Sequence, residues 1–209
     1  MDFTPGNMNW RDGYKLLIGS ILPRPIAFVS TLSKDGIANA APFSFFTVVS
    51  ADPMLVCFSP MRRGSDGAKK DTLRNIEDTG QFVINIVSEG IASQMNQCAT
   101  EFPPDVDEFE VSGLSRMPSA KVKPPRIKES KVHLECELHE VHHYGDQPGS
   151  GSLVIGKVIH IHAEDTLIEN GRVLAEELLP IGRMAGNLYT RPLASTFEIK
   201  RITKPGDQQ

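Results

Sequence analysis

The hydrophobic positions of the chain fall in short runs separated by turn residues, which is typical of a β-rich domain. β-Branched and aromatic residues are dense over residues 26–32, and a returning run follows over residues 37–41. The Asp35-Gly36 pair between them favours a tight turn, because these residue types tolerate a positive φ. The two segments are therefore predicted to pair as a β-hairpin.

Further runs predict more strands. Residues 54–59 and 82–87 are apolar on both faces, which is typical of fully buried strands. Residues 132–138 alternate apolar and polar side chains, so one face is predicted to be dry and the other, with Glu135 and Glu137, to face solvent. Two segments complete the predicted strands: 153–163 and a closing strand at 197–202.

Helical segments are few and short. Residues 71–79 are predicted to form a helix, since Asp71 or Thr72 can cap its start and Gly80 can end it. Two more helices are expected at 88–98 and 176–179. The N-terminal segment offers four helix-face anchors: Tyr14, Leu17, Ile18 and Ile21.

The connections favour antiparallel pairing. Most of the six to eight expected strands are joined by short turns, such as the one marked by Asn170-Gly171. The proline-rich, acidic stretch at 101–128 is expected to run over the surface. The pattern fits a mostly β fold, a closed Greek-key antiparallel barrel with a few short helices, better than a doubly wound sheet. No repeat or linker divides the chain, so residues 1–209 are expected to form one domain.

The composition excludes several classes of protein. The 22 Lys and Arg residues against 26 Asp and Glu give a net charge of −4, so nucleic acid is not an expected partner. No apolar run approaches the ~20 residues that span a bilayer, and the N-terminus lacks the layout of a signal peptide. Three widely spaced cysteines argue against a disulfide framework. A cytoplasmic protein is expected.

Residues 39–46 combine small, polar and aromatic side chains. Ala40 and Ala41 would let the backbone approach a flat ligand, Asn39 and Ser44 offer polar atoms, and Phe45 or Phe46 offers an apolar wall. The alternative is a strand with ordinary core aromatics. Together with residues 23–31, this mixture suits a flat, amphipathic cofactor that carries a phosphate.

Cationic and hydroxyl residues supply candidate phosphate ligands. Ser59, Arg62 and Arg63 follow a predicted strand, and Lys70 and Thr72 stand at a predicted helix start, where backbone N–H groups favour anions. The alternative is that Asp71-Thr72 only caps the helix and the lysines form a solvated face. Arg24 lies between two prolines, and could face either a phosphate or a structural carboxylate.

Three motifs at matching spacing resemble a known family. They are Pro23-Arg24-Pro25-Ile26-Ala27, the Asn39-x-x-Pro42-x-Ser44-x-Phe46 segment, and Lys70-Asp71-Thr72. They resemble the flavin reductase-like branch of the FMN-binding split-barrel proteins, which includes flavoredoxin and the reductase components of two-component flavin monooxygenases. The resemblance covers about residues 14–192. It implies a split β-barrel, usually a homodimer that binds FMN where two subunits meet.

The resemblance also implies roles for individual residues. The phosphate contacts would be Ser59, Lys70, Asp71 and Thr72. Residues matching Asn39, its small neighbour and Ser44 lie along the isoalloxazine ring and ribityl chain, and Ser30 and Thr31 resemble a second set of flavin contacts. Residues 179–189 resemble a segment near the open face of the flavin, which makes Arg183 and Tyr189 candidates for shaping the nicotinamide site. Ala185 departs from the family, in which glycine is frequent at that position.

The function implied is an NAD(P)H-dependent FMN reductase that supplies reduced flavin to a partner oxygenase. Hydride transfer between stacked rings needs no side-chain acid or base, and the absence of a Gly-x-Gly-x-x-Gly motif does not exclude transient NAD(P)H binding. One alternative is an FMN-bound electron carrier of the flavoredoxin type, without NAD(P)H turnover. Another is a His-rich metal-binding barrel. His160 and His162 could form a chelate, although no zinc signature is present, and no native metal is expected.

Overall fold

The computed structural model describes residues 1–199. Its centre is a seven-stranded sheet in the order β2-β1-β5-β8-β9-β4-β3, in which every neighbouring pair is antiparallel. The strands are β1 (Ala27–Leu32), β2 (Ala38–Phe43), β3 (Phe46–Ala51), β4 (Met54–Phe58), β5 (Gln81–Ile86), β8 (Val132–His143) and β9 (Ser152–Ala163). The prediction of a mostly β, antiparallel fold is confirmed. The strand order ends at β2 and β3, so these two described strands do not close the sheet by pairing.

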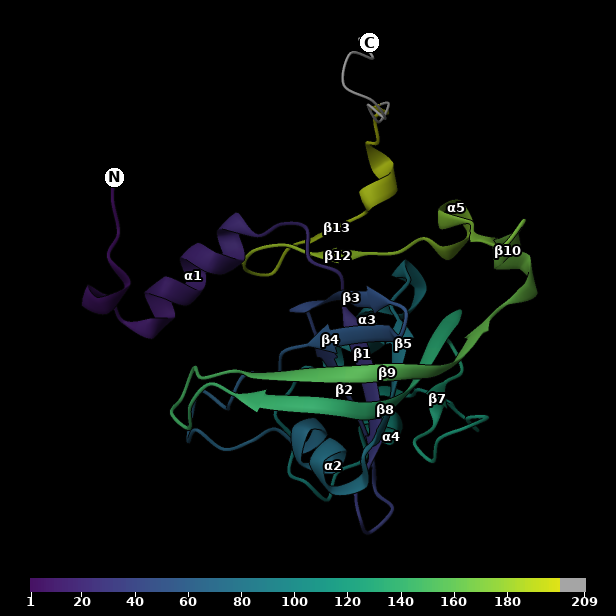
Figure 1. Cartoon of the computed structure of the whole chain (residues 1–209), viewed down its shortest axis with the longest axis horizontal. Coiled ribbons are helices and arrows are strands. Elements are labelled where there is room, and N and C mark those ends of the chain that lie inside the picture. The colour runs from purple at the N-terminus through teal and green to yellow at the C-terminus, as the bar shows by residue number, and fades with distance from the viewer. Residues whose placement is uncertain (200–209) are drawn as a thin grey trace.

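Short helices and hairpins surround this sheet (Figure 1). The helices are η1 (Pro5–Asn7), α1 (Trp10–Ser20), α2 (Asp71–Thr79), η2 (Glu89–Ile91), α3 (Ala92–Gln97), α4 (Glu108–Ser112), η3 (Asp165–Leu167), α5 (Ala175–Leu178) and η4 (Pro192–Ala194). Three two-stranded hairpins pair β6 (Arg116–Met117) with β7 (Arg126–Ile127), β10 (Ile168–Glu169) with β11 (Arg172–Val173), and β12 (Gly182–Arg183) with β13 (Tyr189–Thr190). Among the described residues, the helices are all too short or too polar to cross a membrane.

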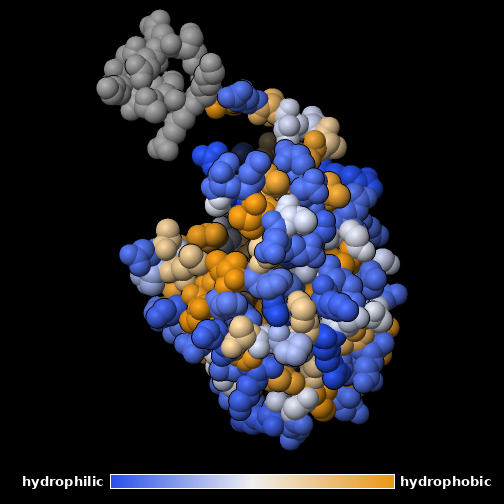
Figure 2. Space-filling model, turned by 90° about the vertical axis from the view of Figure 1, so that its right-hand side faces the viewer, coloured by the Kyte–Doolittle hydropathy of each residue, from blue (hydrophilic) through white to orange (hydrophobic). Residues whose placement is uncertain are grey.

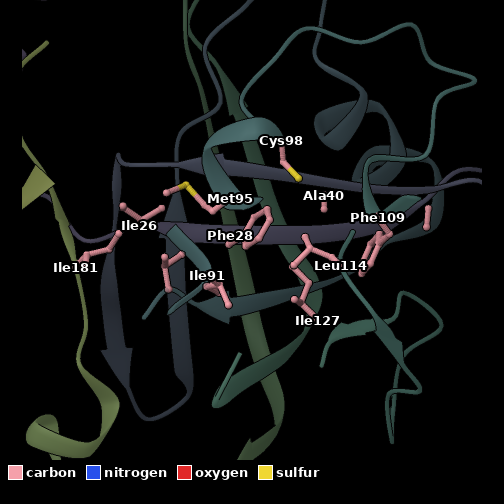
Figure 3. Packing of buried hydrophobic residues seen from close by; sticks show 12 residues of the cluster. Ile26, Phe28, Ala40, Ile91, Met95, Cys98, Phe109, Leu114, Ile127 and Ile181 are labelled. Carbon is pink, nitrogen blue, oxygen red and sulfur yellow. The ribbon is translucent and has the colours of Figure 1, made fainter. Parts of the chain in front are cut away.

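The apolar residues form two core clusters. One packs Leu73 and Ile76 of α2 against Phe58 and Phe82 of the sheet. A side chain at Gly156 of β9 would come within 2.3 Å of the Phe82 ring, so glycine is needed there for close packing. The second cluster joins Phe28, Met95, Phe109 and Ile127 (Figure 3). It ties α3, α4 and β7 to the first hairpin.

Segments with strong local signals fold as predicted. Strands β1 and β2 form the hairpin, and Gly36 takes a φ of +83° at its turn. Helix α2 covers 71–79 and ends at Gly80 in the left-handed conformation, as expected. Its N-cap is Lys70, with no side-chain capping bond, so the expected cap at Asp71 or Thr72 is wrong. Both residues lie within the first helical turn instead.

Several burial predictions are wrong. Met54 is 45% exposed, because β4 lies next to the end strand β3 and only part of the strand is covered. His133 and Glu135 are fully buried. The 115–130 segment covers this face of β8, and the backbone N–H groups of Ala120 and Lys121 donate to Glu135 at 2.8 and 2.6 Å. The predicted surface stretch therefore contributes to the interior.

The two ends of the chain also differ from expectation. Helix α1 buries none of its residues, and the predicted anchors Leu17 and Ile21 are 58% and 60% exposed. Figure 1 shows this helix extending away from the sheet. Residues 197–199 of the predicted closing strand form no strand, and residues 200–202 lie outside the described residues.

Candidate functional site

A pocket of about 510 Å³ lies between α1 and the sheet, and we call it the outer pocket. Five of the residues predicted to bind a cofactor line it: Ser44, Phe45, Ser59, Arg62 and Lys70. The backbone N–H of Ser59 donates to the carbonyl of Phe45 at 2.8 Å, which brings the segment after β4 beside the link between β2 and β3. Residues that the sequence separates are thus gathered along one wall.

Helix α1 supplies the opposite wall, which was not predicted. It contributes Trp10, Arg11, Tyr14 and Lys15. A side chain at Gly149, which has a φ of +90°, would come within 2.6 Å of the Trp10 ring. Only glycine therefore allows this indole to rest on the β8–β9 loop. The i, i+4 spacing of Trp10 and Tyr14 was the available signal, since it places both aromatics on one helix face.

A smaller cavity of about 100 Å³ adjoins the outer pocket, and we call it the inner cavity. Both are lined by Pro42 and Lys70. Asn39, Ala41, Asp71 and Thr72 also line the inner cavity, so it gathers four more of the predicted residues, from β2 and the start of α2.

Electrostatics distinguish the cations around the inner cavity. Arg63 forms an ion pair with Asp71 at 2.8 Å, and Arg74 pairs with the same carboxylate. Lys70 stands apart, with its Nζ 5.9 Å from the Phe43 ring centre. Burial lowers the pKa of Lys70, which Glu101 partly opposes. An anion would relieve the cost of burying this ammonium group.

A buried polar network forms the back of the inner cavity. The Asn39 Oδ1 accepts hydrogen bonds from the hydroxyls of Thr72 at 2.7 Å and Thr31 at 3.3 Å. Its Nδ2 donates to the carboxylate of Glu108 at 2.8 Å, and the backbone N–H of Ala40 donates to the other carboxylate oxygen at 3.3 Å. Burial raises the pKa of Glu108 to about 7, although its hydrogen bonds oppose the shift.

Two predicted residues are committed to structural bonds. The buried Arg24 guanidinium donates to the carbonyls of Ile18 at 2.7 Å and Met184 at 3.1 Å, and to the Ser44 hydroxyl at 3.3 Å. Burial lowers its pKa. The Ser30 hydroxyl donates to the carbonyl of Pro125 at 2.6 Å, beneath the 115–130 segment.

Arg62 lines the outer pocket, but it also donates to the backbone carbonyls of Gly145 and Gly67 at 3.1 and 2.9 Å.

Arg183 and Tyr189 face each other across the β12–β13 hairpin. The guanidinium lies 4.6 Å from the Tyr189 ring centre, and the phenol donates to Asn96 at 3.2 Å. Reciprocal backbone bonds of 3.0 and 2.8 Å join Arg183 to Arg24. The hairpin is thus connected to Ser44 through Arg24. Neither Arg183 nor Tyr189 lines the outer pocket.

Comparison with known proteins identifies the family. The model of the flavin reductase-like domain matches residues 18–179. The chain belongs to this family. Membership makes the protein a flavoprotein of the oxidoreductase class.

Solved structures support the assignment. Nitrilotriacetate monooxygenase component B from Bacillus cereus is 38% identical, with a TM-score of 0.90 over 95% of this chain and 98% of that one. The 2-nitrobenzoate 2-nitroreductase of Pseudomonas fluorescens is 32% identical, with a TM-score of 0.83 over 100% and 98%. A protein with a split barrel domain from Shewanella frigidimarina is 20% identical, with a TM-score of 0.80 over 98% and 100%. This last likeness shows the fold, and the predicted split barrel is confirmed.

The residues present fit a flavin that carries a phosphate. The outer pocket combines the rings of Trp10, Tyr14 and Phe45 with hydroxyl groups, which suits a flat ring system with polar edges. Adjoining it, Lys70 and the uncapped start of α2 offer a cation and backbone N–H groups.

The buried Glu108 escaped the sequence analysis because it lies in the proline-rich stretch without a periodic pattern. Of the two histidines considered as a chelate, His162 contacts the buried His133. The Nδ1 of His162 lies 3.2 Å from that of His133, whose Nε2 bonds the Ile127 carbonyl at 2.8 Å. Among residues 1–199, no three His, Cys, Asp or Glu side chains are grouped to hold a metal.

Proposed function

We propose that the protein is an NAD(P)H-dependent FMN reductase, with FMN held across the outer pocket and the inner cavity. The observation that carries the proposal is Lys70, which lines both and is the cation at the start of α2. The ring and the ribityl chain would lie along Asn39–Phe45, with the ring beside Phe45 in the outer pocket. The phosphate would lie by Ser59, Lys70 and Thr72. Bound FMN would supply two-electron chemistry, accepting a hydride from NAD(P)H and passing electrons on.

The protein's own groups would position the cofactor and exclude water. Trp10 and Tyr14 would cover the ring from α1, and Phe45 would form its apolar wall. Arg183 and Tyr189 would shape the approach of the nicotinamide, since their hairpin is joined to Ser44 through Arg24. No residue is assigned as an acid or base, because stacked rings transfer hydride directly.

We further propose that the protein forms a homodimer. Figure 2 shows hydrophobic residues gathered along a recess of the surface. The exposed apolar residues include Leu17 and Ile21 on and just after α1, which forms one wall of the outer pocket. A second subunit that covers α1 would hold this wall in place. We place the single-domain protein in the cytoplasm, where its three free cysteines would stay reduced.

Flavin absorbance under anaerobic conditions tests the proposal. The purified protein should bind FMN, and NADH or NADPH should bleach the oxidised-flavin band at a catalytic rate. Bound FMN that neither nucleotide reduces would instead identify an electron carrier of the flavoredoxin type. A protein that refuses FMN would contradict both assignments. Adding a flavin-dependent oxygenase, or a nitroaromatic acid, would then identify the class of electron acceptor.

A further inference from the structure

Glu108 lies at one end of a hydrogen-bonded chain that reaches the inner cavity. Its buried carboxylate accepts from Asn39, and Asn39 in turn accepts from the Thr72 hydroxyl. Thr72 lines the inner cavity at the start of α2, where the proposed phosphate would lie. The chain thus connects a titratable group to a candidate ligand of the cofactor.

The ionised carboxylate fixes the direction of every bond in the chain. A carboxylate can only accept, so the Nδ2 group of Asn39 must face Glu108 and Oδ1 must face Thr72. The single hydroxyl proton of Thr72 is then donated to Asn39 and is not available to an anion in the inner cavity. The structure shows this direction of the bonds, with Asn39 Nδ2 donating to Glu108 and the Thr72 hydroxyl donating to Asn39 Oδ1.

A neutral carboxylic acid permits the opposite direction. One oxygen still accepts from the Ala40 N–H, while the other becomes a donor to Asn39. Rotation of the Asn39 amide then presents Oδ1 to Glu108, and the two protons of Nδ2 to the oxygens of Thr72 and Thr31. The Thr72 oxygen accepts, and its proton becomes free to point into the inner cavity beside Lys70.

We propose that Glu108 is a positioning residue, which sets the direction of the Thr72 hydroxyl through Asn39 and couples FMN binding to uptake of one proton. This inference rests on the proposed FMN site. The proton would reach Glu108 without crossing the flavin, because Glu108 also lines a separate cavity of about 220 Å³ beside the β1–β2 turn.

The surroundings of Glu108 support titration near neutral pH. Burial is the main cause that raises its pKa to about 7; the nearby Asp71 acts in the same direction, and the hydrogen bonds from Ala40 and Asn39 oppose it. The Cys98 thiol, directly after α3, stays neutral, because burial raises its pKa to about 11. The remaining charged groups lining the two cavities are Arg63, Lys70 and Glu101 on one side, and Lys34, Asp35, Arg74 and Asp78 on the other.

The variant Glu108→Gln separates the two states. A Gln side chain must accept from Ala40 with its oxygen, so its Nε2 faces Asn39 and holds the amide in the rotated direction. We expect the FMN dissociation constant of the wild type to rise about tenfold from about pH 6 to about pH 8.5. In the variant it should stay at the low value, apart from ionisation of the FMN phosphate, which affects both proteins equally. Parallel pH profiles for the two proteins would overturn the proposal.

A double-mutant cycle distinguishes the relay from direct repulsion between Glu108 and the phosphate. In a Thr72→Val background, Glu108→Gln should no longer tighten FMN binding at high pH, because no hydroxyl remains to be turned. If the full effect of Glu108→Gln persists without the hydroxyl, the carboxylate acts through space and the relay is wrong. The nearly isosteric Val keeps the packing of this buried site.

Calorimetry of the wild type avoids any dependence on folding of the variants. FMN titrations near pH 7.5, in buffers of different ionisation enthalpy, should show net proton uptake beyond that of the FMN phosphate itself. FMN binding without this uptake would overturn the role of Glu108 and leave the proposed reductase intact. No FMN binding at any pH would instead overturn the proposed function.

Discussion

The outer pocket and the inner cavity differ in how their polar groups are used. Around the inner cavity, Asn39, Thr72 and Glu108 are buried and bonded to one another. In the outer pocket, Ser59 uses its backbone N–H to hold the wall, and its side chain makes no hydrogen bond among residues 1–199. Residues predicted to be cofactor ligands can therefore belong to the structural framework. Removing polar side chains at the inner cavity should therefore lower stability, and removing polar side chains in the outer pocket should alter affinity alone.

The largest effect is expected from Asn39→Ala. The change leaves the Glu108 carboxylate and the Thr72 hydroxyl without a buried partner, which should lower the free energy of unfolding by about 4 kcal/mol. Urea denaturation measures this. Asn187→Ala is the matched control, because Asn187 is exposed, and it should change stability by less than about 0.5 kcal/mol. If Asn39→Ala lowered the free energy of unfolding no more than Asn187→Ala does, Asn39 would not belong to the structural framework.

The next effect concerns pH. Because the pKa of Glu108 is raised from 4.5 to about 7, the folded protein holds this proton more tightly than the unfolded chain. Its contribution to stability is therefore full below about pH 4.5 and falls as the pH rises to about 7, by about 3 kcal/mol in total. Burial lowers the pKa of His133 to about 4, which gives the opposite slope between about pH 4 and its ordinary value of 6.5.

The two opposing slopes are separated by comparing the wild type with Glu108→Gln. The difference in their free energies of unfolding should change across this range, because His133 contributes equally to both proteins. If this difference in free energy stays constant with pH, folding does not raise the pKa of Glu108. The inner cavity and the outer pocket differ in this respect, because no comparable buried acid lines the outer pocket among the described residues.

A smaller effect is expected where α1 meets the sheet. Gly149→Ala forces a side chain into the left-handed region and against Trp10, which should cost about 2 kcal/mol and loosen the outer wall. Trp10 is the single tryptophan of the chain, so its fluorescence reports the displacement directly. Gly64→Ala is the control, because its new side chain would meet Trp10 at an ordinary 3.9 Å. Unchanged spectra in both variants would mean that Trp10 is held by other contacts.

Local signals in the sequence were sufficient for much of the fold. The Asp35-Gly36 turn and the boundaries of α2 are confirmed because each depends on residues close together in the chain. Glu135 was misplaced because its partners, Ala120 and Lys121, come from a segment that folds over β8. The alternation of a strand reports which residues share a face, but it does not report what covers that face.

The candidate site divides in the same way. Ser44 lies in a motif with matching spacing and Ser59 follows a predicted strand, and the structure brings both to the outer pocket. Glu108 and Trp10 were missed, because each reaches the site through tertiary packing and neither belongs to a motif. The burial that makes Asn39 a framework residue is likewise a property of the fold, since it depends on α2 and α4 packing against β2.

The smallest effect on stability, and the sharpest test of the contrast, is expected from Ser59→Ala. The hydroxyl makes no hydrogen bond among residues 1–199, and the backbone N–H that holds Phe45 is retained, so unfolding should change by less than about 0.5 kcal/mol. FMN affinity should nevertheless fall about tenfold if the hydroxyl donates to the phosphate. Quenching of Trp10 fluorescence by added FMN measures the affinity, and riboflavin, which lacks the phosphate, should bind both proteins equally. A loss of stability as large as the loss of affinity would place Ser59 in the framework with Asn39, and the division between the two regions would disappear.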